Sequence, residues 1–157
     1  MQIAQDDPTR ADVTALLREH LADMVATSPP ESVHALDIDA LLHPSITFVT
    51  ARRDSLLLGC AALKELDPAH AEIKSMRTTA AARGTGVGRA LLAHLINLAR
   101  NRGHTRLSLE TGTQTYFEPA RALYRTAGFI QTGPFASYTV DPNSGAATQS
   151  GPWSLTS

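Results

Sequence analysis

The sequence predicts an α/β fold in which helices cover both faces of a mixed, mostly antiparallel, twisted sheet. The first observation is the spacing of apolar residues, which predicts a strand, a helix, a short helix, three antiparallel strands, and then helix, strand, helix and strand. The second is size, because a chain of 157 residues that is 43% hydrophobic suits one domain with a sizeable core. We expect a single domain over residues 1–157, with 141–157 as an atypical C-terminal segment.

A strand and a helix begin the chain. Residues 2–6 can form a short strand. Asp7 followed by proline predicts a helix start, because a capping side chain is combined with a proline at the first helical position. Apolar residues at helical spacing follow until the Ser-Pro-Pro run at 28–30. After a loop, a short helix is expected over 38–42.

Three strands come next. Residues 46–49 and 56–63 predict a hairpin around the polar turn 51–55, whose arginines we expect in solvent. The third strand spans 70–78. Because strand side chains alternate between faces, three of its side chains are predicted to share one face: Glu72, Lys74 and Met76.

Three glycines at alternate positions precede the next helix. Gly84, Gly86 and Gly88 let the backbone approach a ligand closely, and the helix that they enter runs to Arg102 before Gly103 stops it. The first turn of a helix has unpaired N–H donors and a partial positive charge. This loop is therefore suited to bind an anion such as a phosphate.

The last predicted elements alternate strand and helix. Residues 105–111 predict a strand, Pro119 opens a helix, and Gly128 followed by phenylalanine closes it as a glycine cap with an apolar anchor. A further strand is expected over 129–132, and residues 153–155 can pair late with the sheet.

Two common phosphate-binding motifs fit the glycine loop poorly. A P-loop requires lysine and then serine or threonine after the last glycine, whereas Arg89 and Ala90 stand here. A Rossmann fingerprint requires glycine at the place of Arg89 and glycines directly after a strand, whereas residues 79–83 intervene. Because Glu110 lies about where a ribose-binding acid would, a Rossmann-type dehydrogenase is the runner-up.

Two motifs together resemble the GNAT superfamily of acetyl-CoA-dependent N-acetyltransferases. The run Arg-Gly-Thr-Gly-Val-Gly at 83–88 resembles its R/Q-x-x-G-x-G/A signature, and residues 123–129 resemble its L-Y-x-x-x-G-F motif at the end of a helix. They occur in the expected order, and the resemblance extends over residues 46–133. It implies the GNAT fold, acetyl-CoA as co-substrate and an amine as acetyl acceptor.

The resemblance also assigns residues to the coenzyme. The backbone of Met76, Arg77 and Thr78 would pair with the pantetheine arm like an added strand. One amide there, that of Met76, would face the thioester oxygen as an oxyanion hole. The coenzyme A pyrophosphate would be held by the backbone amides of the glycine loop: Arg83, Gly84, Thr85, Gly86, Val87, Gly88 and Arg89.

Tyr124 and Glu72 are the catalytic candidates. A phenol with a pKa of about 10 can hydrogen-bond to the departing thiolate and return a proton, the role that the resemblance gives to Tyr124. The amine must lose a proton before it attacks, and Glu72 matches an acidic position used by several members of the superfamily. The alternatives are a core tyrosine with a paired hydroxyl and a strand carboxylate paired with Lys74.

The other reactive side chains are not expected to act as nucleophiles or metal ligands. Cys60, in an apolar strand, is expected to be inert core, so direct transfer without a covalent enzyme intermediate is expected. The six histidines show no pair at metal-ligand spacing with a cysteine or acidic partner, so we expect no metal. Arg121 and Arg125 are expected to be exposed. The superfamily often has asparagine seven residues before the tyrosine, where this chain has Phe117.

Composition limits the remaining classes. A net charge of −1 supplies no broad basic surface for nucleic acid. Residues 1–7 lack a basic region followed by an apolar run, no later run is apolar for membrane-spanning length, and the single cysteine forms no intrachain disulfide, so we expect a cytoplasmic protein. We expect a small-molecule amine acceptor, and likeness alone favours a homodimer. The alternative from another class is a non-catalytic sensor module that binds coenzyme A or a nucleotide.

Overall fold

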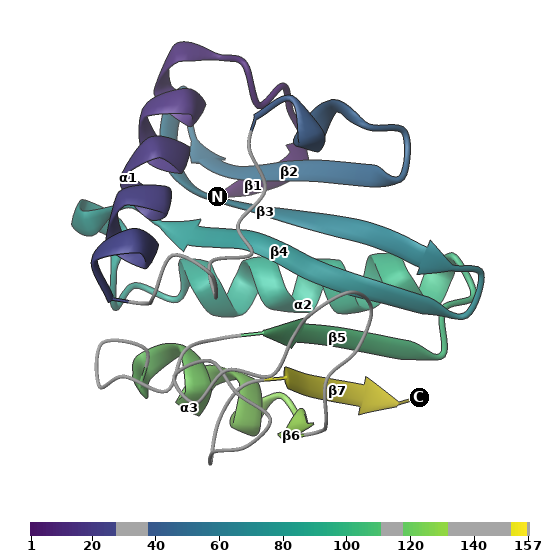
Figure 1. The fold of residues 1–157 in the computed structure, drawn as a ribbon. Coiled ribbons are helices and arrows are strands. Elements are labelled where there is room, and N and C mark those ends of the chain that lie inside the picture. The colour runs from purple at the N-terminus through teal and green to yellow at the C-terminus, as the bar shows by residue number, and fades with distance from the viewer. Residues whose placement is uncertain (28–37, 111–117, 132–151, 157) are drawn as a thin grey trace.

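The computed structural model describes residues 1–27, 38–110, 118–131 and 152–156, which form a seven-stranded sheet with helices on both sides (Figure 1). The strand order is β1-β2-β3-β4-β5-β7-β6, and every neighbouring pair is antiparallel except β4 and β5. The strands are β1 (Gln2–Gln5), β2 (Ile46–Arg53), β3 (Leu56–Asp67), β4 (His70–Thr78), β5 (Arg106–Glu110), β6 (Ile130–Gln131) and β7 (Pro152–Thr156). The helices are α1 (Ala11–Thr27), α2 (Val87–Asn101) and α3 (Glu118–Thr126), with 3₁₀ turns η2 (Ala40–Leu42) and η3 (Ala80–Ala82). The predicted α/β class and mostly antiparallel sheet are confirmed.

Two apolar clusters lie on opposite faces of the sheet. The smaller one joins α1 to the strands through Val13, Leu17 and Phe48. The larger one gathers around Leu91 and Leu95 of α2 and also holds residues of α3 and the central strands. Because successive strand residues point to opposite faces, the central strands supply side chains to both clusters. Figure 1 shows α1 and α2 on opposite sides of β3 and β4.

The helix start predicted at Asp7 is wrong, because α1 begins at Ala11. The Asp7 carboxylate instead accepts hydrogen bonds from the backbone N–H and the hydroxyl of Thr9, at 2.8 and 2.6 Å. These bonds close a local turn before the helix. The helical bonding then begins with the N–H of Thr14, which donates to the carbonyl of Arg10.

Arg52 lies within β2 and not in the hairpin turn, which is formed by residues 54–55. Its guanidinium contacts the carboxylate of Asp6 at 3.1 Å and that of Asp12 at 2.7 Å, and its side chain is largely buried. The expectation that Arg52 lies in solvent is therefore wrong, because two carboxylates of the N-terminal segment pair with it. Arg53 is exposed, as expected.

β4 carries a bulge at Ser75, a residue with a left-handed φ of +55°. The register with β3 pairs Lys74 with Ala62 but Arg77 with Cys60, so three steps along β4 match two along β3. One extra residue in a strand turns all later side chains to the opposite face.

The bulge moves Met76 away from the face that carries Glu72 and Lys74. Met76 packs against the larger cluster, on the α2 side, whereas the guanidinium of Arg77 reaches Glu19 of α1 at 2.6 Å. The shared face predicted for Glu72, Lys74 and Met76 is wrong for Met76, because that prediction assumed an unbroken alternation.

The parallel pairing between β4 and β5 is short. It joins His70, Ala71 and Glu72 to Arg106, Leu107 and Ser108. β4 then continues to Thr78, and no described strand pairs with its β5 side beyond Glu72. Such an edge leaves backbone groups available to an extended ligand.

β7 lies between β5 and β6 and pairs antiparallel with both. This confirms the late pairing predicted for residues 153–155. The expectations for the rest of the C-terminal segment, over residues 132–151, and for Phe117 concern positions outside the described residues.

The predicted helix stops are also confirmed. Gly103 follows α2 with φ of +87°, and Gly128 follows α3 with φ of +99°. Phe129 is buried behind this cap, as the predicted apolar anchor requires. None of the helices in the described residues is both long and apolar enough to cross a membrane.

Candidate active site

The glycine loop has a backbone that glycine adopts most readily. Gly84 and Gly86 have φ of +76° and +91°, a left-handed conformation that costs other residues about 1–2 kcal/mol. Gly86 directly precedes α2, and no side chain caps the helix there. A Cβ at either glycine would meet no protein atom within 4 Å, so the space beside the backbone is open.

Backbone donors are available at the start of α2. Among the described residues, no acceptor bonds to the N–H groups of residues 86–89, and the first helical bond runs from Ala90 to the Gly86 carbonyl at 3.0 Å. Adjacent free N–H groups at the positive end of a helix dipole suit a doubly charged anion. The loop therefore fits the diphosphate that the resemblance predicted.

Three segments meet beside this loop. An ideal Cβ on Gly88 would lie 3.5 Å from the Leu123 side chain and 3.7 Å from the Thr78 hydroxyl. The start of α2, the end of β4 and the middle of α3 are therefore close together. The structure thus brings together the loop, the predicted pantetheine strand and the helix that carries Tyr124.

Gly59 of β3 allows α2 to start close to the sheet. A Cβ there would lie 2.9 Å from the Arg77 carbonyl oxygen and 3.1 Å from the side chains of Val87 and Leu91. Such distances leave no room for a side chain, so this glycine sets the spacing between the helix and β3. A glycine inside an apolar strand is a sequence signal of close approach, and our sequence reasoning missed it.

The Tyr124 ring lies in the larger cluster with 7% of its surface exposed. Its centroid is 5.9 Å from that of Phe129. Burial raises the pKa of the phenol, so the hydroxyl stays protonated near neutral pH. A protonated phenol on the helix that lies beside the loop can donate to a developing thiolate, and it can equally serve as a packed core residue.

The Glu72 side chain is 2% exposed, and its Oε1 lies 3.4 Å from the ammonium of Lys74. Within the described part of the chain, nothing bonds to its Oε2. One oxygen thus pairs with Lys74, as the alternative reading predicted, and the other is left to receive a proton. Glu72 lies six residues before Thr78, which is about 20 Å along a strand, so it is not adjacent to the glycine loop.

An ion pair that the sequence did not predict ties α1 to the site. The Glu19 carboxylate accepts a hydrogen bond from Arg77 at 2.6 Å and lies 3.7 Å from Arg83 of the glycine loop. Because the Arg77 side chain is buried, this contact fixes the end of β4 against α1. An acidic residue on a surface helix is too common to signal such a role.

A second polar pair lies beside Glu72 and was also missed. Ser108 of β5 is the register partner of Glu72, and its hydroxyl lies 2.7 Å from Nε2 of His70. Ser108 is fully buried, whereas His70 is partly exposed. Burial, and then the charge of Arg106, lower the pKa of the His70 imidazole.

Two expectations on other side chains can be compared with the structure. Cys60 is buried, as predicted, and burial raises the pKa of its thiol to about 12. Arg125 is exposed, but Arg121 is 8% exposed, so the expectation of an exposed side chain is wrong for Arg121. Arg121 lies three residues before Tyr124, on the same buried face of α3.

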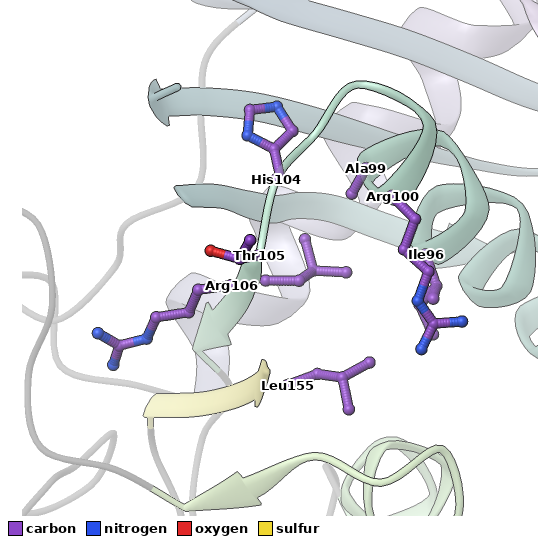
Figure 2. Close-up of a pocket in the computed structure, with 8 residues that line it drawn as sticks. Ile96, Ala99, Arg100, His104, Thr105, Arg106 and Leu155 are labelled. Carbon is purple, nitrogen blue, oxygen red and sulfur yellow. The ribbon is translucent and has the colours of Figure 1, made fainter. Parts of the chain in front are cut away.

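A pocket lies at the opposite end of α2 from the glycine loop (Figure 2). It is lined by Ile96, Ala99, Arg100, His104, Thr105, Arg106, Leu107 and Leu155. These residues come from the C-terminal half of α2, the loop that follows it, the start of β5, and β7. None of the predicted site residues lines it, so this pocket is not part of the candidate site.

Comparison with known proteins gives the chain relatives along almost its whole length. A family model described as "Acetyltransferase (GNAT) family" matches residues 13–129. The uncharacterized N-acetyltransferase YsnE of Bacillus subtilis is 52% identical over 144 residues, which cover 92% of this chain and 95% of that protein. IAA acetyltransferase of Azospirillum brasilense is 38% identical over 144 residues, covering 89% and 91%. The structure of a GNAT family acetyltransferase from Elizabethkingia anophelis with acetyl-CoA bound has the same fold, with a TM-score of 0.67 and 21% identity over 99% of this chain and 97% of that one.

Proposed function

The chain belongs to the acetyltransferase (GNAT) family, and from this premise we propose that it moves the acetyl group of acetyl-CoA directly to a primary amine of a small molecule. Membership makes it an N-acetyltransferase that uses acetyl-CoA as co-substrate. The class of acceptor, the direct mechanism and the roles of individual residues are the proposal.

The glycine loop is the observation that carries the proposal. Its open space and free N–H groups at residues 86–89 support a diphosphate at the start of α2, and the free edge of β4 supports an extended pantetheine arm beside it. In this arrangement the backbone of residues 83–89 holds the diphosphate, and that of residues 76–78 pairs with the arm. Arg83 is half exposed and lies at the edge of the loop, where its charge favours an anion.

Three residues supply the chemistry. Glu72 takes a proton from the acceptor ammonium, which leaves a neutral amine with a free electron pair. The amine attacks the thioester carbon, and the N–H of Met76 stabilises the oxyanion that forms. The carbon–sulfur bond then breaks, and Tyr124 donates a proton to the thiolate and regains one from the nitrogen that has formed the amide.

Direct transfer is proposed because the sole cysteine does not suit a covalent intermediate. The raised pKa of the buried Cys60 thiol keeps it protonated, and a thiol in this state is a poor nucleophile. Initial rates at several concentrations of both substrates test this step. Intersecting double-reciprocal lines are expected, whereas parallel lines would show a ping-pong mechanism and overturn it.

A small-molecule acceptor is supported by the relative named IAA acetyltransferase, which is 38% identical to this chain. The test is a panel of small primary amines, amino acids, amino sugars and peptides, incubated with acetyl-CoA while free thiol is followed. We expect thiol release with at least one small amine, together with an acetylated product of matching amount. Acetylation of peptides alone would overturn the proposed acceptor class.

Tyr124→Phe and Glu72→Gln test the two catalytic roles in the same assay. Each variant keeps the shape of its side chain, so we expect kcat to fall at least about tenfold with little change in thermal stability. Wild-type kcat in both variants would remove these residues from the mechanism. Binding of coenzyme A without thiol release from any amine would instead favour a sensor module.

A further inference from the structure

A row of polar side chains crosses the otherwise apolar centre of the sheet beside Glu72. His70, Glu72 and Lys74 alternate along β4 before the bulge, so they share one face. Ser108 lies opposite Glu72 on β5, and its hydroxyl is 2.7 Å from Nε2 of His70. Neighbouring strands are about 4.8 Å apart, so the two side chains are neighbours on one face, although among the described residues no hydrogen bond joins the Ser108 hydroxyl to Oε2 of Glu72.

Acetyl transfer creates a proton that must leave this buried place. An acceptor ammonium loses two protons when it becomes an amide, and the coenzyme thiolate takes up only one. If Glu72 is the base, as proposed above, it holds the other proton at the end of each turnover. Glu72 is 2% exposed and Ser108 is 0% exposed, so neither releases a proton directly to bulk water.

We propose that Ser108 and His70 form the proton exit from Glu72 to solvent, and this inference rests on the proposed role of Glu72. After a rotation of its side chain towards Ser108, the protonated carboxyl of Glu72 donates its proton to the Ser108 oxygen while the Ser108 hydroxyl donates its own to Nε2 of His70. The carboxylate is thereby restored and an imidazolium forms. His70 is partly exposed and passes one proton to water.

The charges around the row suit this direction of transfer. Burial lowers the pKa of His70, and so do the nearby charges of Arg106 and His104, while Asp67 acts in the opposite sense. A lowered pKa keeps the imidazole neutral as an acceptor near neutral pH and makes its imidazolium a ready donor. Lys64 and Lys74 both lie beside Glu72, on β3 and β4, and Lys74 pairs with its Oε1.

Chemical rescue gives a direct test. His70→Ala, Ser108→Ala and a His94→Ala control are compared for thiol release from about pH 6 to about pH 9, with and without added imidazole. We expect kcat of His70→Ala and Ser108→Ala to fall about tenfold, with an unchanged KM for acetyl-CoA. Imidazole should restore kcat in His70→Ala only, because Ser108→Ala keeps the histidine but lacks the link to Glu72. His94 lies on α2, across the sheet, and its variant should match the wild type.

The outcomes separate the relay from the function on which it rests. Wild-type kcat and pH profile in His70→Ala, while Glu72→Gln is slow, would overturn the relay alone. So would a loss in His70→Ala that imidazole leaves unchanged. A wild-type rate in Glu72→Gln would overturn the proposal that Glu72 is the base. Absence of thiol release by the wild-type protein would overturn the proposed function.

Discussion

Cys60 determines the background of any thiol measurement on this protein. Its side chain is fully buried, and burial raises the pKa of its thiol to about 12. Because the thiolate is the reactive species, we expect a disulfide reagent to detect no thiol in the native protein and one per chain after denaturation. The absorbance of the released chromophore measures the number of reactive thiols in the native and in the denatured protein. Rapid reaction of the native protein would contradict the buried position.

The Asp6 carboxylate makes the stability of the fold depend on pH in the acidic range. Partial burial raises the pKa of its carboxyl, but hydrogen bonds from Thr50, Arg10 and Arg52, together with a backbone N–H, outweigh this and lower it to about 2. A carboxylate with a depressed folded pKa stabilises the protein above its unfolded pKa, and this contribution is lost as the pH falls towards the folded value. The pH window for Asp6 therefore runs from about 4 down to about 2.

We expect Asp6→Asn to lower the melting temperature at neutral pH and to flatten its decline in this window. Thermal unfolding followed by circular dichroism at several pH values measures the effect. The loss at neutral pH is on the order of 1 kcal/mol, because the pair with Arg52 is only partly desolvated. Asp39→Asn, at an exposed position, is the control. Parallel pH profiles for wild type and Asp6→Asn would contradict the role of this cluster.

At the scale of elements, the two ends of α2 offer a matched pair of glycines. Gly86 and Gly103 have φ of +91° and +87°, and a Cβ on either would meet no protein atom within 4 Å. Alanine therefore strains both backbones alike, by about 1–2 kcal/mol. Only the methyl group at Gly86 would enter the space proposed for the diphosphate.

We expect Gly86→Ala to raise the KM for acetyl-CoA about tenfold or more, and Gly103→Ala to leave it unchanged. Both variants should lose similar thermal stability, which shows that the difference in KM is not a folding effect. Thiol-release kinetics and thermal unfolding measure the two quantities. Equal KM values in the two variants would count against the diphosphate site.

The contact between β3 and the start of α2 gives a contrasting pair. A Cβ on Gly59 would lie 2.9 Å from the Arg77 carbonyl oxygen, whereas one on Gly88 would have no protein contact shorter than 3.5 Å. Gly59→Ala must push the helix away from the sheet, and we expect it to destabilise the protein by about 1–3 kcal/mol. Gly88→Ala should keep the melting temperature and still weaken acetyl-CoA binding. A stable Gly59→Ala variant would show that the helix start has room to move.

At the scale of the whole molecule, the sequence predicts the features that depend on neighbouring residues in the chain. The strand and helix order, the Gly103 and Gly128 stops and the burial of Cys60 each depend on a short run of residues, and all are confirmed. The bulge at Ser75 was missed because strand alternation carries no sign of one extra residue. Pairs between distant segments, such as Arg52 with two N-terminal carboxylates, depend on how the segments pack.

The same distinction applies to the candidate site. The glycine loop is one continuous motif, so its position at the start of α2 could be predicted. Glu19 and Ser108 come to the site only because α1 and β5 pack against β4, and nothing in their own neighbourhoods marks them. Gly59 is the exception, because a glycine in an apolar strand is a readable signal.

Closure of the sheet on its β5 side depends on the last strand of the chain. β7 is paired with β5 at five positions and with β6 at two, and Leu155 packs against the larger cluster. In the described residues β6 has no other strand partner, so β7 connects β6, and α3 before it, to the rest of the sheet. Removal of residues 152–157 should therefore free the edge of β5 and loosen the helix that carries Tyr124.

We expect this truncation to lower the melting temperature by more than about 5 °C, because two strand pairings and an apolar contact are lost together. Thiol release should fall further than stability alone explains, since Tyr124 loses its support. Leu155→Ala in the full chain is the control, because it keeps the backbone ladder and removes only part of the packing, at a cost of about 1–2 kcal/mol. A truncated protein with the melting temperature and kcat of the wild type would show that β7 is dispensable for holding α3 against the sheet.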